Sequence, residues 1–323
     1  MTIHRRKFLM ASAGAAVLPA LPRAAFAIDY PTRPVRVIVG FPAGIGPDIA
    51  GRLMSQWLSE RLGQQFIVDN RPGASSNIAT GDVAKAVPDG YTLLVAVSTN
   101  AINATFYKNL NFDFNKDIVP VGFIGSTPFV MVVTPSFPAK TVPEFIAYAK
   151  ANPGKVNMAS QGVGTSPHVT GEMLVMMTGI DLVHVPYRGN VVPDLLSGQV
   201  QVYFSPLPQV IEYVRDGRLR ALAVTSTKRS DALPDVPALA EFVSGYEASG
   251  WYSICAPAGT PGEIVDKLNK EINAGLADPA LHAKLLAVGI EPKAMTQAEF
   301  AKFVGDEIQK WSKVINFADI KAE

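Results

Sequence analysis

The chain has 323 residues, of which 48% are hydrophobic and 18% are charged, and its formal net charge is +1. This composition is typical of a globular protein and excludes a chain that is disordered throughout. The length is sufficient for about two domains of ordinary size.

Residues 1–27 have the organisation of an export signal. A basic stretch at residues 5–7 precedes a weakly apolar segment at residues 8–21, and small residues precede a cleavage site after Ala27. This order is typical of a signal peptide, and the two arginines that open the basic stretch resemble those of a twin-arginine signal. The twin-arginine route and the general secretory route both remain open, and both predict a periplasmic protein from which the signal has been removed.

The chain that follows the signal is predicted to be soluble and slightly acidic. The signal contains four of the 29 Lys and Arg residues and none of the 28 Asp and Glu residues, so 25 basic and 28 acidic residues remain and the net charge is near −3. Nucleic acid is not expected as a partner, because phosphate binding needs a basic surface. No segment reaches the about 20 apolar residues that a membrane-spanning helix needs. The single cysteine, Cys255, lies in an apolar context that predicts a buried thiol.

Apolar runs of strand length alternate with helical patterns along the exported chain. Helices are expected at residues 47–62, 261–277 and 297–315, each with its apolar side chains on one face. The expected strands are VRVIVG (35–40), QQFIVDN (64–70), YTLLVAVS (91–98), VPVGFIG (119–125), FVMVVTP (129–135), KVNMASQ (155–161), LVHVPY (182–187), VQVYFS (200–205), LRALAVTS (219–226) and WYSICAP (251–257). This alternation predicts an α/β fold in which mixed, mostly parallel sheets are flanked by helices.

Two helix starts carry the signature of a capping box. Thr141-Val-Pro-Glu144 and Thr260-Pro-Gly-Glu263 each place a threonine three residues before a glutamate, with a proline near the first turn. In such a box the threonine side chain accepts the N–H of the glutamate. Both threonines are therefore predicted to be N-caps.

Three loops share one pattern, in which a strand is followed by small residues and then by a helix. They are FPAGIGPD (41–48), STNAIN (98–103) and SQGVGTSPH (160–168). Glycine allows the backbone to approach a ligand closely, and the unpaired N–H groups of a helix start favour an anion. Each loop is a candidate seat for a carboxylate or a phosphate, although such loops can also do no more than turn the chain. Because the chain lacks both GxGxxG and GxxxxGK[ST], a carboxylate fits better than a nucleotide.

Each of three side chains in or near these loops has two possible roles. Asp48 can hold its loop by accepting backbone N–H groups or can contact the ligand, and His168 can donate to a ligand or can cap and pack. Arg188 in VPYRGN can pair with a carboxylate or can lie on the surface. The chain has no GxSxG, no HExxH and no Cys/His cluster, so no catalytic residue, metal or cofactor is expected.

Several segments in fixed order resemble the extracytoplasmic solute receptors of the tripartite tricarboxylate transporter family, which are also called Bug receptors. They are DYPTRPVRVIVGFPAG, DNRPGASSNIATGDVAKAVPDGYTLL, SQGVGTSPH, VPYRG, LRALAVTSTKRSDALPDVPALAEF and GWYSICAPAGTP. The resemblance extends from about Tyr30 to Trp311, which is nearly the whole exported chain.

This resemblance implies a type II periplasmic binding fold, with two lobes that close on a small organic carboxylate. The first lobe would contain residues 28–127 and 250–323, and the second would contain residues 128–249. Its partners would be a di- or tricarboxylate or an aromatic acid and the integral-membrane permease subunits of the transporter, and it would be a monomer. The implied ligand-binding residues are Phe41, Ala43, Gly44, Ile45, Asp48, Ser98, Thr99, Asn100, Ser160, Gly162, Gly164, Thr165, His168, Tyr187, Arg188, Gly189 and Ser205.

The chain departs from the family pattern at three places. Ile45 and Pro47 stand where relatives usually have glycine and threonine, Ser205 stands where aspartate is common, and the segment after Gly189 is shorter than usual. The first departure favours a less polar or bulkier acid than a simple dicarboxylate. Two other functions remain open, namely an exported enzyme that acts on a small organic acid and a ligand sensor without a role in transport.

Overall fold

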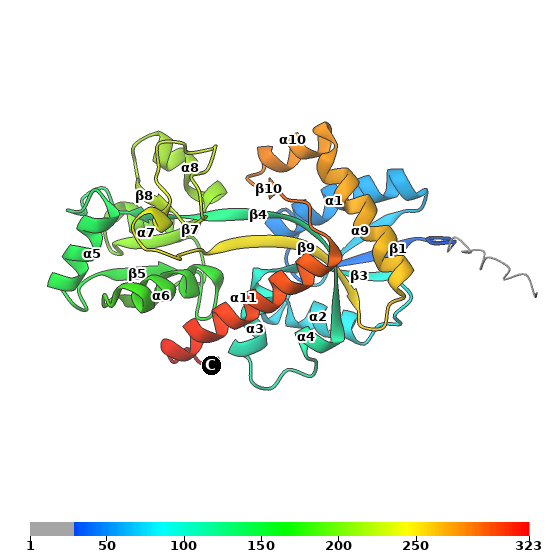
Figure 1. Ribbon diagram of the computed structural model, residues 1–323. Coiled ribbons are helices and arrows are strands. Elements are labelled where there is room, and N and C mark those ends of the chain that lie inside the picture. The colour runs from blue at the N-terminus through cyan, green and yellow to red at the C-terminus, as the bar shows by residue number, and fades with distance from the viewer. Residues whose placement is uncertain (1–28, 323) are drawn as a thin grey trace, which may run out of the picture.

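The computed structural model describes residues 29–322, so the predicted signal peptide lies outside the described residues. Two groups of strands and helices lie side by side, and two long strands, β4 (Ile118–Val133) and β9 (Ser249–Pro257), run between them (Figure 1). The strand order is β2-β1-β3-β9-β4-β7-β5-β6, and β8 and β10 also pair with β4. The fold is therefore mixed α/β with flanking helices, as the alternation of elements predicts.

The first half of the molecule is built on a parallel group of strands. These are β1 (Val35–Val39), β2 (Phe66–Asn70) and β3 (Thr92–Val97), and β9, β4 and β10 (Glu291–Pro292) continue the sheet in antiparallel fashion. Its helices are α1 (Gly46–Leu62), α2 (Asn77–Ala84), α3 (Ser98–Phe106), α4 (Phe114–Asp117), α9 (Gly262–Ala277), α10 (Pro279–Ala287) and α11 (Gln297–Phe317), with a 3-10 turn at Ala74–Ser76. Alternate residues of β1 enter different core clusters, since Val37 packs under α1 and Ile38 packs under α2. This explains why Val37, Ile38 and Val39 are all apolar and buried, because both faces of the sheet are covered.

The second half repeats this plan on a smaller scale. Its strands are β5 (Asn157–Ser160), β6 (Val183–Pro186), β7 (Val202–Pro206) and β8 (Arg220–Val224), of which β5 is parallel to β6 and β7. Its helices are α5 (Val142–Ala151), α6 (Ser166–Thr178), α7 (Val192–Ser197) and α8 (Leu207–Arg215), with a 3-10 turn at Leu239–Glu241. β4 joins this half as well, since residues 129–133 pair with β7 and β8.

β4 corrects the expectation of two separate strands at residues 119–125 and 129–135. The polar residues Ser126 and Thr127 interrupt the apolar pattern, but they keep pairing with Trp251 and Gly250 of β9. Pairing therefore continues through the junction, and the two apolar runs become the two ends of one strand of 16 residues. The apolar pattern of the sequence did not predict this continuity, because pairing with the neighbouring strand, and not burial of one face, holds the backbone extended at the junction.

The two predicted capping boxes have different outcomes. Thr141 accepts the N–H of Glu144 at 3.3 Å, which confirms the N-cap of α5. The prediction for Thr260 is wrong, because its hydroxyl donates to the carbonyl of Pro257 at 2.8 Å and Pro261 takes the N-cap position of α9. A carbonyl three residues earlier in the turn competes successfully for the hydroxyl.

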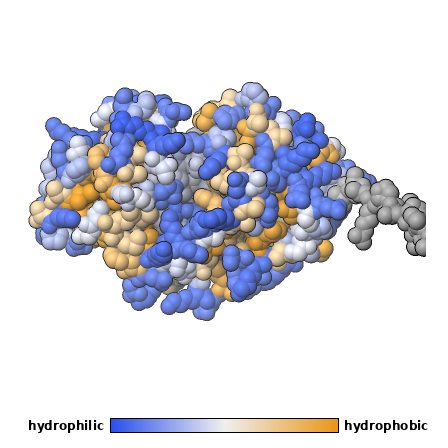
Figure 2. Space-filling view, viewed as in Figure 1, coloured by the Kyte–Doolittle hydropathy of each residue, from blue (hydrophilic) through white to orange (hydrophobic). Residues whose placement is uncertain are grey.

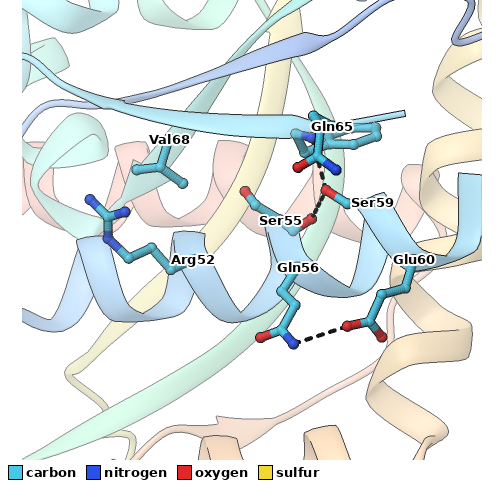
Figure 3. A pocket seen from close by; sticks show the side chains of 8 residues that line it. Arg52, Ser55, Gln56, Ser59, Glu60, Gln65 and Val68 are labelled. Atoms are coloured by element: carbon cyan, nitrogen blue, oxygen red, sulfur yellow. Dashed lines mark hydrogen bonds between the residues drawn. The ribbon is translucent and has the colours of Figure 1, made fainter. Parts of the chain in front are cut away.

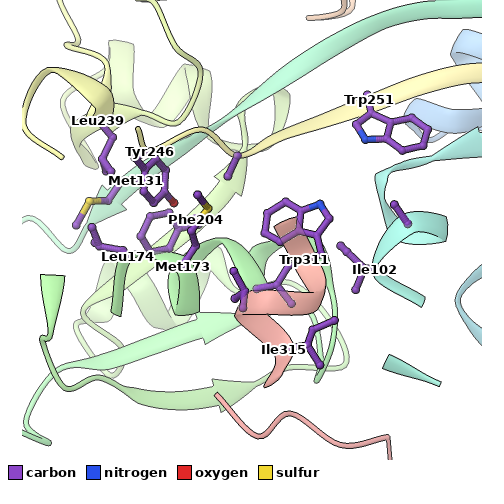
Figure 4. Packing of buried hydrophobic residues seen from close by; sticks show 14 of the residues in the cluster. Ile102, Met131, Met173, Leu174, Phe204, Leu239, Tyr246, Trp251, Trp311 and Ile315 are labelled. Atoms are coloured by element: carbon purple, nitrogen blue, oxygen red, sulfur yellow. The ribbon is translucent and has the colours of Figure 1, made fainter. Parts of the chain in front are cut away.

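The C-terminal helix α11 packs against both halves of the molecule. Figure 4 shows Trp311 between Trp251 of the crossing strand and Met173 of α6, and all three belong to one core cluster. The buried carboxylate of Glu307 accepts both indole N–H groups, each at 3.0 Å, and pairs with Lys310. α11 is thus bonded to the strand that links the halves.

Two further expectations concern burial and the membrane. Cys255 is 1% exposed, and burial raises the pKa of its thiol to about 12, so the predicted buried thiol is confirmed. Among the helices within residues 29–322, none is both long and apolar enough to cross a membrane.

Candidate functional site

The three loops singled out in the sequence meet where the two halves of the molecule join. β1 and β3 are adjacent and parallel, so α1 and α3 begin at the same edge of the sheet. α6 begins after β5 in the second half, and its Ser166 Oγ lies 3.4 Å from Ser98 Oγ at the start of α3. The first turns of three helices are therefore brought together from both halves.

The first loop is held by a buried carboxylate. Asp48 is 2% exposed and accepts the N–H of Gly44 at 2.9 Å, the Nε–H of Arg52 at 2.9 Å and the amide of Asn70 at 2.9 Å. Burial by itself would raise the pKa of Asp48, but these donors and the charge of Arg52 lower it. Asn70 also donates to the carbonyl of Phe41 at 3.0 Å, which fixes the other end of the loop. Of the two readings of Asp48, the geometry supports the one in which it holds the loop.

The second loop has the same construction with a different acceptor. Gly164 has a φ of +74°, as Gly44 has a φ of +84°, and in both loops a proline occupies the second position of the helix that follows. The N–H of Gly164 donates to Nδ1 of His168 at 3.1 Å, and His168 is 4% exposed. Since Nδ1 accepts, the neutral ring carries its proton on Nε2, which lies 3.6 Å from a carboxylate oxygen of Glu172.

A second histidine supports the ring of His168. The rings of His168 and His184 stack with centroids 3.5 Å apart and an interplanar angle of 7°. Nε2 of His184 lies 2.6 Å from Oγ of Ser160, which in turn accepts the N–H of Gly162 at 3.1 Å. Burial and the neighbouring His168 lower the pKa of His184 to about 4. His184 therefore stays neutral near pH 7, where it stacks on His168 and bonds to Ser160 without carrying a charge.

A buried polar network, which the sequence did not reveal, holds the start of α3 in place. Asn100 accepts the N–H of Val97 at 2.8 Å and donates to Thr80 at 2.8 Å, and Asn103 donates to the carbonyl of Ser75 at 2.8 Å. Ser75 belongs to the turn 74–76, in which three consecutive non-glycine residues have positive φ. Such a turn is strained. Asparagines at positions 100 and 103 of one helix face were the available signal, but the acceptors of their amide N–H₂ groups lie 20 or more residues earlier.

The predicted ligand-binding residues divide into three groups by exposure. Asp48, Asn100, Ser160, His168 and Ser205 are buried, and their side chains hydrogen-bond within the protein. Ser98 and Gly164 are buried near the contact between α3 and α6. The remaining residues are partly or fully exposed, namely Phe41, Ala43, Gly44, Ile45, Thr99, Gly162, Thr165, Tyr187, Arg188 and Gly189.

The segments around Tyr187 and Ser205 lie at the same edge as the glycine loop of the second half. β6 and β7 flank β5 and are parallel to it, so the residues at their carboxyl ends approach the end of β5. The N–H of Tyr187 donates to the carbonyl of Ser160 at 2.9 Å, and its hydroxyl donates to Asp194 at 2.7 Å. Arg188 is exposed and makes no ion pair with any residue in the range 29–322. Ile45 is 44% exposed, so its side chain is not buried in the junction as a plug.

Two surface pockets lie away from these loops. One, of about 380 Å³, lies between α1 and β2, and Figure 3 shows Gln56 bonded to Glu60 and the Ser59 hydroxyl bonded to the carbonyl of Ser55 along it. The other, of about 370 Å³, lies between α2 and residues 109–112. The space-filling view shows a notch in the surface between the half that carries α8 and the half that carries α10 (Figure 2). The convergence of the loops at this junction, and not either pocket, defines the candidate site.

Two α/β halves joined by crossing strands, with helix starts facing their junction, define the class of solute-binding receptors. The model of the tripartite tricarboxylate transporter family receptor matches residues 50–320, and the chain belongs to this family. It is 37% identical over 293 residues to protein BugT of Bordetella pertussis. The aligned region covers 88% of this chain and 89% of that protein.

Solved structures of similar proteins agree with this assignment. The Rhodopseudomonas palustris protein Rpa4515, solved with adipate, is 36% identical with a TM-score of 0.78 and covers 91% of this chain and 99% of its own. The periplasmic binding protein BugD is 32% identical with a TM-score of 0.74, over 91% of this chain and 100% of its own. MatC from Rhodopseudomonas palustris, solved with malate, is 28% identical with a TM-score of 0.74, over 88% of this chain and 100% of its own.

Proposed function

We propose that this receptor binds an organic carboxylate at the junction of its two halves and delivers it to the permease of a tripartite tricarboxylate transporter. The observation that carries the proposal is the meeting of the first turns of α1, α3 and α6, which begin at Gly46, Ser98 and Ser166. Main-chain N–H groups at helix starts attract anions through their dipoles and need no compensating lysine. Similar proteins with adipate or malate bound support a small dicarboxylate as the ligand class.

Titration calorimetry on the exported chain tests this function. Adipate, malate, citrate and benzoate sample length, charge and aromaticity, and at least one acid is expected to bind with a dissociation constant near 1 μM, which corresponds to about −8 kcal/mol. A ligand that binds only the folded state also raises the melting temperature, so a thermal scan gives an independent readout. The absence of both signals over the whole panel would contradict the proposal.

The lobes that close on the ligand are proposed to be residues 28–127 with 250–323 and residues 128–249. The pairing of β4 supports this division, since residues 118–128 pair with β9 and residues 129–133 pair with β7. Residues 1–27 are proposed to direct export to the periplasm, and the exported receptor is proposed to act as a monomer. Light scattering at micromolar concentration tests the monomer, and N-terminal sequencing of the periplasmic protein tests cleavage after Ala27.

A catalytic role has one specific observation in its favour, because Oγ of Ser160 lies 2.6 Å from Nε2 of His184. A serine next to a histidine base is the usual arrangement of an activated nucleophile. However, Ser160 is 0% exposed, and a histidine whose pKa is lowered to about 4 is a weak base near pH 7. These features support binding without chemical change. Recovery of unaltered adipate after prolonged incubation, measured by NMR, is the expected result, and consumption of the acid would reverse this assignment.

A further inference from the structure

Tyr252 lies on the crossing strand β9 directly beside the start of α3. It is paired with Val97, the last residue of β3, and its side chain packs against the core cluster that covers the α1 face of the sheet. Its hydroxyl reaches the first residue of α1, because a Cβ on Gly46 would lie 2.4 Å from the phenol oxygen and 3.1 Å from Cζ. The phenol thus touches the helix start that belongs to the candidate site.

The hydroxyl of Tyr252 differs from those of the buried residues Tyr30 and Tyr246, which both have a partner in the protein. Tyr30 donates to the carbonyl of Gly90 at 2.6 Å, and Tyr246 donates to the carbonyl of Thr170 at 2.8 Å. The Tyr252 hydroxyl makes no hydrogen bond to any residue that the structure describes, although the side chain is only partly exposed. A tyrosine whose ring packs on apolar side chains while its hydroxyl has no protein partner is typical of a binding surface, where one end of the side chain is apolar and the other is wet. Burial raises the pKa of Tyr252 to about 12, so the group is a neutral donor near pH 7.

The neighbouring main-chain donors are also free. The N–H groups of Gly46 and Asp48 belong to the first turn of α1 and have no acceptor within residues 29–322, while Pro47 has no N–H. Two N–H groups and one phenol O–H therefore lie at one helix start. Arg52, the cation on the next turn of α1, is bonded to Asp48 and Asn70 and so does not compete there.

We propose that Tyr252 is a ligand-contacting residue, which donates its O–H to a carboxylate oxygen seated against the first turn of α1. This inference rests on the proposed function and deepens it, since it assigns neutral donors to the ligand carboxylate in the first half. It also gives Gly46 a specific role. Any side chain at position 46 would displace the phenol from the place where it can donate.

The substitution Tyr252→Phe tests the contact by removing a single oxygen atom. Adipate and malate serve as probes in titration calorimetry, and the acid that the unmodified receptor binds more tightly is used for the comparison. The affinity is expected to fall by about tenfold or more, the usual effect of losing a hydrogen bond to a charged group. The melting temperature without ligand is expected to stay unchanged, since no protein partner loses a bond.

Tyr148→Phe is the matched control. Tyr148 is also a partly buried tyrosine, but it lies on α5 at the far end of the second half, where its ring packs edge-on against Phe137. Its substitution is expected to leave the affinity unchanged. Equal affinities of Tyr252→Phe and the unmodified receptor would overturn the inference while the proposed function stands. No binding of any acid by the unmodified receptor would overturn the function and the inference together.

A second substitution, measured alone, keeps the test informative if Tyr252→Phe alters folding; combined with a folded Tyr252→Phe, it tests whether both positions share one contact. Gly46→Ala is expected to weaken binding at least as much as Tyr252→Phe, because its Cβ meets the phenol oxygen. In the background of Tyr252→Phe the same substitution is expected to have a smaller effect, since the oxygen is gone. Such non-additivity indicates a shared contact. Additive effects, or no effect of Gly46→Ala, would contradict the inference.

Discussion

The two glycine loops of the site are held by the same kind of hydrogen bond, but the acceptor differs between them. In each loop a glycine with positive φ donates its N–H to the third residue of the following helix, and a proline occupies the second position. The acceptor is the carboxylate of Asp48 in the first half and the imidazole of His168 in the second. The geometry of the loop therefore requires an acceptor four residues after the glycine. The chemical identity of this acceptor decides how the loop responds to charge and pH.

The largest expected effect comes from neutralising the charged acceptor. Asp48→Asn removes the anion that pairs with Arg52 and introduces an amide N–H₂ among existing donors. The free energy of unfolding at pH 7 is expected to fall by about 3 kcal/mol, because Asp48 is buried and its donors lose a charged acceptor. Urea denaturation measures the change. The control Asp306→Asn removes an exposed ion pair with Lys302 and is expected to lower the free energy of unfolding by less than about 0.5 kcal/mol. An equal loss in both variants would contradict a special role for the buried carboxylate.

Acid is expected to weaken the second loop before the first. The pKa of His184 is about 4 in the folded state, below its usual value of 6.5, so the unfolded chain binds more protons between these values. The stability that this group contributes is present above pH 6.5 and is lost as the pH falls toward 4. It amounts to at most about 3 kcal/mol. The pKa of Asp48 is lowered from an already acidic value, so its contribution is lost only at still lower pH.

Urea denaturation at pH 7.5, 6 and 5 measures this difference. The groups that face His184 are His168 and Ser160, and Glu172 lies beside His168 on α6. In His184→Gln the dependence on pH over this range is expected to flatten, because no imidazole is left to protonate at that position. If the variant keeps the full dependence, the histidine pair is not its source.

The smallest effect is expected from the two prolines. Pro47→Ala and Pro167→Ala each leave the helix start in place and add conformational freedom to the unfolded chain. Each is expected to lower the free energy of unfolding by about 0.5–1 kcal/mol. Thermal denaturation measures both. A much larger loss at only one position would show that the two loops are not equivalent.

The loops that converge at the junction were predictable from sequence because their signal was local. The three loops were identified because glycine, proline and small residues followed apolar runs, and the structure brings those loops together. One of the two roles considered for Asp48, accepting backbone N–H groups of its own loop, agrees with the bond that it receives from Gly44. Tyr252 was not identified, because WYSICAP read only as a strand and nothing in the sequence connects residue 252 with residue 46.

The sequence by itself determined the alternation of strands and helices, because periodicity, proline and glycine act on the backbone over a few residues. The family was indicated separately, by several motifs in fixed order that resemble its members. Only the tertiary structure decided that β4 is one continuous strand, that Thr260 does not cap α9, and that His184 supports His168. Each of these outcomes depends on a partner that the fold supplies: strand β9, the turn at Pro257 and strand β6. Hydrogen bonding and stacking act only at contact distance, so pattern alone did not predict which partners would meet.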